Sequence, residues 1–156
     1  MSAPADTTLS VGITLSLGEV ALRLGLAFLL GALAGIERQW HHKNAGLRTH
    51  TLVAVGAAAF TLVSSLGLGP TTNPMLIAAG VVTGIGFIGG GVIMHQGQTV
   101  QGINTAATLW TTASMGLAAG AGYYAVTVIV FVAVMLVQLP LQRVERWIDH
   151  RSERSR

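Results

Sequence analysis

The sequence predicts an all-α membrane protein: a bundle of about five transmembrane helices with glycine-rich packing faces, its N-terminus outside and its C-terminus in the cytoplasm. Of its residues 51% are hydrophobic and only 10% are charged, and the mean hydropathy is +0.62. Soluble domains carry about 25% charged residues. Apolar runs of the length that crosses a bilayer, about 20 residues, recur along the chain, and Lys and Arg gather in alternate connecting segments.

The candidate spans are apolar runs separated by short polar or glycine-rich segments. They cover residues 17–36, 47–66, 75–94, 103–121 and 122–141. The last two are divided only by GAGYY, but a single helix over 103–141 would be far longer than a bilayer is thick. We therefore expect three regions. These are a polar N-terminal segment (1–16), a five-span transmembrane domain (17–141) and a basic amphipathic cytoplasmic tail (142–156).

The charges of the loops predict the orientation. The first loop, ERQWHHKNAGLR, carries Arg38, Lys43 and Arg48, and five further arginines follow Pro140. The loops GLGPTTNP and GAGYY carry no Lys or Arg. Because cytoplasmic loops are enriched in Lys and Arg, the first loop and the C-terminus are expected inside. An odd number of spans then puts the N-terminus outside.

The glycines of GVVTGIGFIGGGVIM include a G-x-G-x-x-G match at 84–89. A dinucleotide fingerprint must follow a strand, open a soluble helix and precede an acidic residue by about 20 positions. This match lies inside an apolar run with no such acid, so we predict no dinucleotide site. Small residues four apart instead let helices approach closely in lipid, although their density in the third span also permits a broken helix. The predicted packing glycines are Gly31, Gly35, Gly80, Gly84, Gly86, Gly90, Gly116 and Gly120.

A polar cluster is predicted at the cytoplasmic face, where the first span closes and the second and fourth spans open. It consists of Glu37, Arg38, Arg48, Thr49, Asn104 and Thr105. Two helix N-termini, each with partial positive charge, point to the same face. The cluster could contact an anion, a lipid headgroup or a partner helix. Alternatively, Arg38 and Arg48 are topology anchors and Asn104 is an N-cap.

Glu19 and Arg23 lie four residues apart on the first span, the spacing of a favourable helical ion pair. An outer ion-entry site is the alternative. Mg²⁺ is usually bound by carboxylates, and the spans contain only Glu19 and Glu37, about 27 Å apart on one helix. One chain cannot build a midplane carboxylate site from them, so we predict no metal site and no cofactor. Only an oligomer could bring several Glu37 side chains together.

Four stretches resemble the MgtC/SapB family of bacterial inner-membrane proteins, in the family's order and spacing. They are GALAGIERQW, AGLRTHTLVAVGAAAF, VVTGIGFIGGGVIM and VQGINTAATLWTTASMGL, within about residues 25–120. The resemblance implies a multi-pass inner-membrane protein linked to growth at low magnesium and, in pathogens, to virulence. It also implies an accessory or regulatory role rather than proven transport, and supports functional roles for Glu37, Arg38, Arg48 and Asn104.

The chain departs from the family pattern in two respects. Thr111 follows TLW where many members have Cys, so a role that depends on that thiol would be lost. Many members also carry a cytoplasmic C-terminal domain of an ACT-like kind, and the resemblance here is to the membrane domain alone.

The sequence therefore predicts a non-enzymatic accessory protein of magnesium homeostasis that acts through helix–helix contacts, with magnesium as a substrate or signal at most. The alternatives are an oligomeric transporter or channel for magnesium or another ion, and a structural membrane protein with no link to ions. No cysteine is present, which excludes thiolate chemistry. Expected partners are membrane lipids, other membrane proteins through transmembrane helices, and a second copy in a homo-oligomer. The net charge of +3 lies mostly in the tail and does not indicate nucleic acid.

Overall fold

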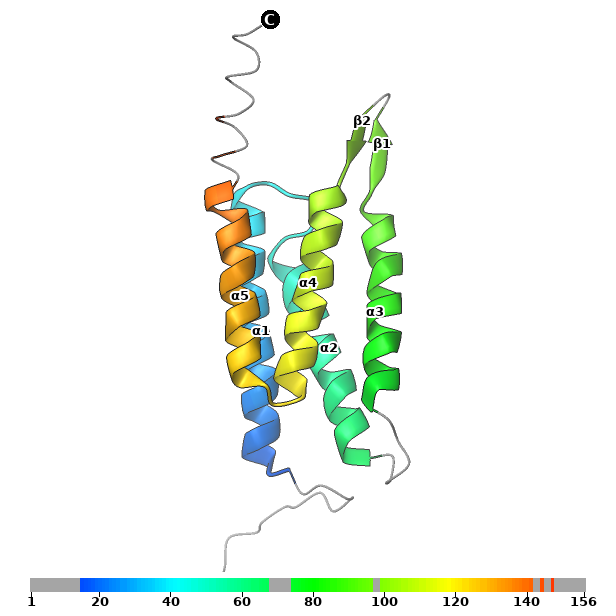
Figure 1. Ribbon diagram of the computed structural model, residues 1–156, viewed down its shortest axis with the longest axis vertical. Coiled ribbons are helices and arrows are strands. Elements are labelled where there is room, and N and C mark those ends of the chain that lie inside the picture. Colours follow the sequence, from blue (N-terminus) through cyan, green and yellow to red (C-terminus); the bar gives the residue numbers. More distant parts are fainter. Residues whose placement is uncertain (1–14, 68–73, 97–98, 142–143, 145–146, 148–156) are drawn as a thin grey trace, which may run out of the picture.

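The computed structural model describes residues 15–67, 74–96, 99–141, 144 and 147, and this part of the chain forms five helices and one short hairpin. Successive helices run in opposite directions along an elongated bundle (Figure 1). The elements are α1 (Leu17–Trp40), α2 (Leu47–Gly67), α3 (Pro74–Gly91), β1 (Met94–Gln96), β2 (Thr99–Gln101), α4 (Ile103–Gly120) and α5 (Tyr124–Gln138). The predicted N-terminal segment lies almost wholly outside the described residues, as does the predicted tail apart from Val144 and Trp147.

Two of the described helices are long and apolar enough to cross a membrane. They are α1, with 24 residues, and the stretch Leu47–Ser65 of α2, with 19 residues. The apolar stretches Met75–Gly91 and Tyr124–Gln138 are shorter. α3 is one continuous helix, so the broken helix that the glycine density permits does not occur.

Local chemistry accounts for where the helices begin and end. The Ser16 hydroxyl accepts a hydrogen bond from the Glu19 backbone N–H at 3.2 Å and caps α1. α4 follows Gly102, whose φ of 93° lies in the left-handed region, and a Cβ there would collide with the Val92 carbonyl. Gly122, with a φ of 83°, makes the tight turn between α4 and α5, and such backbone angles favour glycine.

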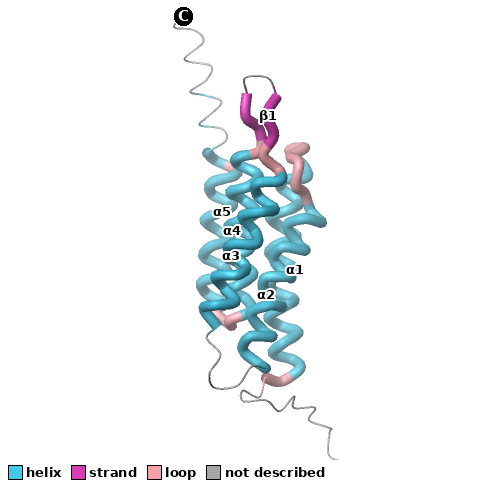
Figure 2. Tube along the Cα trace, turned by 90° about the vertical axis from the view of Figure 1, so that its right-hand side faces the viewer, coloured by secondary structure: helices cyan, strands magenta, loops and turns pink. Residues whose placement is uncertain are grey.

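The hairpin β1–β2 extends beyond the end of the helical bundle (Figure 2). Its strands pair antiparallel, with His95 opposite Val100. The predicted third span runs to Met94, but α3 ends at Gly91 and Met94 already belongs to β1. The helix that covers the predicted third span is therefore shorter than that span, and Met94–Gln96 forms a strand that pairs with Thr99–Gln101.

α2 lies between α1 and α4, and glycines bring both neighbours close to it. A Cβ on Gly31 would lie 2.7 Å from the Ala54 Cβ, and one on Gly35 would lie 2.6 Å from a backbone atom of α2. From the other side, a Cβ on Gly116 would collide with the Ala54 carbonyl, and one on Gly120 would lie 2.5 Å from another α2 carbonyl. The backbones of α1, α2 and α4 therefore touch where side chains are missing, as small residues allow in lipid.

The glycines of α3 do not pack in this way. A Cβ on any of Gly80, Gly84, Gly86 or Gly90 would meet no atom within 4 Å. α3 packs against α4 through another face, where a Cβ on Gly89 would lie 3.5 Å from the Ala106 Cβ. Within one chain, these four glycines therefore do not form the packing face that their spacing suggested. The spacing alone could not reveal which side of a uniformly apolar helix meets its neighbours.

The close contact at α4 yields a test with a matched control. Gly116→Ala should destabilise the fold by about 1–3 kcal/mol, the usual range for overpacking, because the new Cβ would collide with the Ala54 carbonyl. Gly86→Ala should keep or slightly raise stability, because its Cβ meets open space and alanine is the better helix former. Unfolding of the purified proteins in detergent measures both. Equal stability of Gly116→Ala and the unmodified chain would rule out this contact.

Candidate functional site

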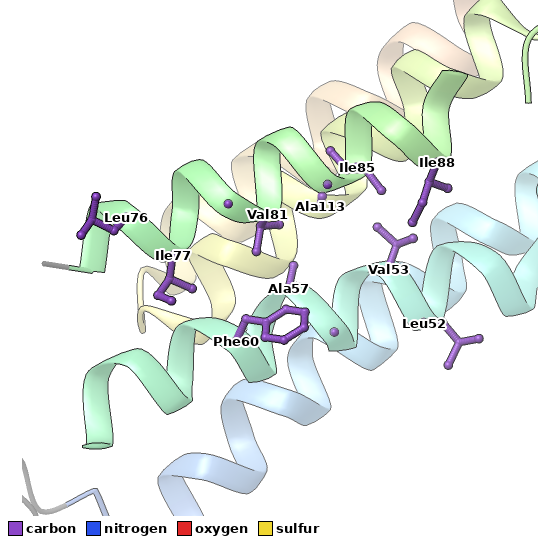
Figure 3. A pocket seen from close by; sticks show the side chains of 13 residues that line it. Leu52, Val53, Ala57, Phe60, Leu76, Ile77, Val81, Ile85, Ile88 and Ala113 are labelled. Atoms are coloured by element: carbon purple, nitrogen blue, oxygen red, sulfur yellow. The ribbon is translucent and has the colours of Figure 1, made fainter. Parts of the chain in front are cut away.

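An apolar groove lies between α2 and α3 and has a volume of about 610 Å³ (Figure 3). Its lining is apolar throughout and comes from α2 and α3, with Ala113 contributed by α4. Three of the lining residues are glycines, Gly56, Gly80 and Gly84, and a Cβ on any of them would meet nothing within 4 Å. We call this feature the α2–α3 groove. An apolar helix that entered this groove could come close to the backbones of both α2 and α3.

Large side chains stand at the edges of the α2–α3 groove. Leu52 and Phe60 of α2 and Leu76 of α3 line it and are 72%, 62% and 70% exposed within the chain. Figure 3 shows Phe60 and Ile77 at one end of the groove, on opposite walls. Because these large side chains stand beside glycines, the walls of the groove are uneven and offer hydrophobic contact area.

Arg38 is the most unusual residue at the end of the bundle where α1 ends and α2 and α4 begin. Its side chain is completely buried, at 0% exposure. Its Nη2 donates to the Thr105 Oγ1 of α4 at 3.2 Å. Its Nε and Nη1 have no hydrogen-bond partner among the described residues. The structure thus brings together Arg38 and Thr105 of the predicted cluster.

His50 of α2 is also completely buried at this end. Its Nδ1 lies 2.8 Å from the Thr112 Oγ1 of α4, and its Nε2 has no partner among the described residues. Sequence reasoning missed both residues. The available signal was a histidine inside an apolar helix, but its partner lies 62 positions away along the chain.

Glu37 is buried, but its carboxylate makes no ion pair with Arg38. Consecutive residues of a helix are about 100° apart, and the His41 Nδ1 lies 2.9 Å from the Glu37 Oε1. Neither carboxylate oxygen has a hydrogen-bond partner among the described residues, and the His41 Nδ1 is hydrogen-bonded to the Glu37 backbone carbonyl at 2.9 Å. At the same end of the bundle, the Gln138 amide of α5 is buried, and neither of its polar atoms has a described partner.

The remaining predicted members lie outside this buried group. Arg48 and Asn104 are exposed, and Thr49 is half-buried. The expectation that Asn104 caps α4 is wrong, because Gly102 occupies the N-cap position and offers no side-chain cap. The Asn104 side-chain oxygen instead accepts a hydrogen bond from the Thr108 hydroxyl at 3.3 Å.

At the opposite end, Glu19 and Arg23 form a close pair that also joins three helices. The Arg23 Nε donates to the Glu19 Oε1 at 3.0 Å, and its Nη1 donates to the Gly120 carbonyl at 2.9 Å. The Tyr124 hydroxyl donates to the same Glu19 oxygen, a contact that sequence reasoning missed. Because Glu19 and Arg23 are hydrogen-bonded to each other and to Tyr124 and Gly120, the pair connects α1 to the turn between α4 and α5.

Metal ligation has little support in the geometry of the described residues. They contain no group of three or more His, Asp or Glu side chains placed to hold a metal ion. Thr111, where many members of the resembled family have Cys, bonds the Thr108 carbonyl at 3.0 Å within its own helix. Among the described residues we single out two features, the α2–α3 groove and the buried group around Arg38, which consists of Arg38, Thr105, His50 and Thr112.

Comparison with known proteins gives consistent matches. The sequence model of the MgtC family matches residues 24–147. An uncharacterised protein of Synechocystis sp. is 47% identical over 132 residues, which cover 85% of this chain and 56% of that protein. Protein MgtC of Brucella abortus is 50% identical over 131 residues, covering 82% of this chain and 55% of that protein. Protein MgtC of Salmonella typhimurium is 50% identical over 129 residues, covering 80% and 55% respectively. This chain thus spans about half the length of these relatives, and no solved structure matches it.

Proposed function

The chain belongs to the MgtC family, and from this premise we propose that it is an accessory or regulatory protein of the bacterial inner membrane, linked to magnesium homeostasis. It acts by contacts between transmembrane helices. The observation that carries this proposal is the α2–α3 groove, an apolar surface with bare glycines on both walls.

The groove suits a helix better than it suits a polar ligand. Lipid tails are as apolar as leucine side chains, so helices in a bilayer gain little from hydrophobicity and associate through close packing. Gly56 on one wall and Gly80 and Gly84 on the other leave the backbones accessible. A helix of another membrane protein could therefore approach both walls closely while Leu52 and Phe60 pack against its sides.

All five helices cross the membrane in this proposal, with the ends of α1 and α5 on the cytoplasmic side. The 18 residues of α3 are about 27 Å long, slightly less than the hydrocarbon core of about 30 Å. A short helix is tolerated when the bilayer thins locally or flanking residues reach the interface. The basic first loop and the loops without Lys or Arg at the other end of the bundle support the orientation.

The orientation can be measured with reporter fusions. A fusion at Asn44 should report cytoplasm, and one at Pro70 should report the periplasm, because the loops alternate across the membrane. A fusion after Arg156 should again report cytoplasm. A periplasmic signal from the last fusion would contradict an odd number of spans.

The groove can be tested with two glycine variants of the same helix. Gly84→Leu should abolish support of growth at low magnesium at normal membrane levels, because a large side chain would fill the α2–α3 groove. Gly86→Leu should keep that support, because Gly86 does not line the groove and its Cβ would meet no atom of the chain. Growth of a deletion strain carrying each variant, with immunoblots of membranes, measures both. Full growth with Gly84→Leu would contradict the proposal.

The accessory role predicts that the purified protein alone does not carry magnesium. Glu19 and Glu37 are the acidic residues among those described, and they lie near opposite ends of α1. Liposomes containing the protein and a magnesium-sensitive dye should therefore show the same inward flux as empty liposomes. Saturable flux that disappears in Glu37→Gln would instead support the oligomeric transporter.

A further inference from the structure

We propose that the buried group around Arg38 is a binding site for a phosphate group, supplied either by free inorganic phosphate or by a phospholipid headgroup. This inference goes beyond the proposed function and does not depend on the groove. Its basis is the Arg38 guanidinium, which the fold encloses without an ion-pair partner among the described residues.

The Arg38 guanidinium is completely buried, and no carboxylate among the described residues lies within 4.0 Å of it. Its one described partner is a neutral hydroxyl, and Nε and Nη1 are unpartnered. Enclosing a charge without an ion-pair partner is unfavourable, and each unsatisfied donor adds to the cost. An acceptor that is not part of the described chain would remove both costs.

The carbonyl groups at the end of α1 do not supply this acceptor. The Glu37 carbonyl accepts the His41 N–H at 3.2 Å, the Arg38 carbonyl accepts the Lys43 N–H at 3.1 Å, and the Gln39 carbonyl accepts the His42 N–H at 3.1 Å. The α1 C-terminus is therefore closed by its own loop. The Glu37 carboxylate lies beside His41 and is not paired with Arg38.

One helix N-terminus adjoins the guanidinium, and a second lies beside the preceding turn of α1. Thr105, which Arg38 bonds, lies in the first turn of α4, and no side chain caps that helix. Gly35, one turn before Arg38, abuts Leu47, the first residue of α2. Helix N-termini carry partial positive charge and unpaired N–H groups. Their convergence on a buried cation is unfavourable without an anion and favourable with one.

A phosphate group fits this set of donors. It has several acceptor oxygens in a tetrahedral arrangement, so it can accept from the Arg38 Nε and Nη1 and from the start of α4 together. Arginine and helix N-termini are both recurrent phosphate-binding groups.

The test uses the full chain, purified in a maltoside detergent that contains no phosphate. The thermal midpoint of unfolding is followed in two titrations at constant ionic strength. The first compares sodium phosphate with sodium chloride. The second compares dihexanoyl phosphatidylglycerol, below its micellar concentration, with dihexanoyl glycerol, which lacks the phosphate. A ligand that binds only the folded state raises the midpoint with its concentration.

We expect a saturable rise with at least one phosphate compound and none with its control. A rise with inorganic phosphate identifies a site for the free anion, and a rise with the lipid alone identifies a headgroup site. Arg38→Gln should abolish the rise, and Thr105→Val should weaken binding by about tenfold through loss of a positioning hydroxyl. Lys43→Gln removes one exposed positive charge at the same end and should leave the rise unchanged.

Two results would overturn the proposal. One is the absence of a saturable rise with either phosphate compound in the unmodified chain. The other is a rise that persists in Arg38→Gln, which would place binding elsewhere. If Arg38→Gln does not fold, Arg38→Lys serves instead. It keeps the charge but not the planar set of donors, so unchanged binding in that variant would equally contradict the proposal.

Discussion

The close approach of α1 and α4 to the two sides of α2 is the constraint on which the rest of the structure depends. Gly31 and Gly116 meet α2 from opposite sides at Ala54, so the three backbones are separated by little more than van der Waals contact. Such contact replaces the hydrophobic driving force that helices lack in lipid. Around this contact the buried residues are mostly alanines, with Leu30 and Met115 filling the remaining space. α3 and α5 then lie at the periphery, α3 on α4 and α2, and α5 on α4 and α1.

The α2–α3 groove and the buried group around Arg38 both follow from this arrangement. α3 packs on α4 through the face that contains Gly89, so its other glycines are left along the α2–α3 groove or facing outward. The buried side chains of Arg38 and His50 belong to residues near the ends of their helices. Thr105 and Thr112 of α4 provide their partners.

The sequence predicted the approximate position of each helix because long apolar runs end at glycines, prolines or charges. It could not predict which glycines pack. α3 is apolar on all sides, so the face toward α4 and the faces away from it have the same composition. His50 was missed for a related reason, because its burial depends on Thr112, a residue distant in sequence. The hairpin was missed because strands of three residues are too short to show an alternating pattern.

The groove and the buried group around Arg38 share two helices. On α4, Ala113 lines the α2–α3 groove while the preceding residue, Thr112, contacts His50. On α2, Val53 lines the groove one turn after His50. α3 contributes no residue to the buried group, whereas Arg38 lies on α1 and does not line the groove. Substitutions on α3 and at Arg38 consequently address the two features one at a time, and any effect of one on the other would have to pass through α2 or α4.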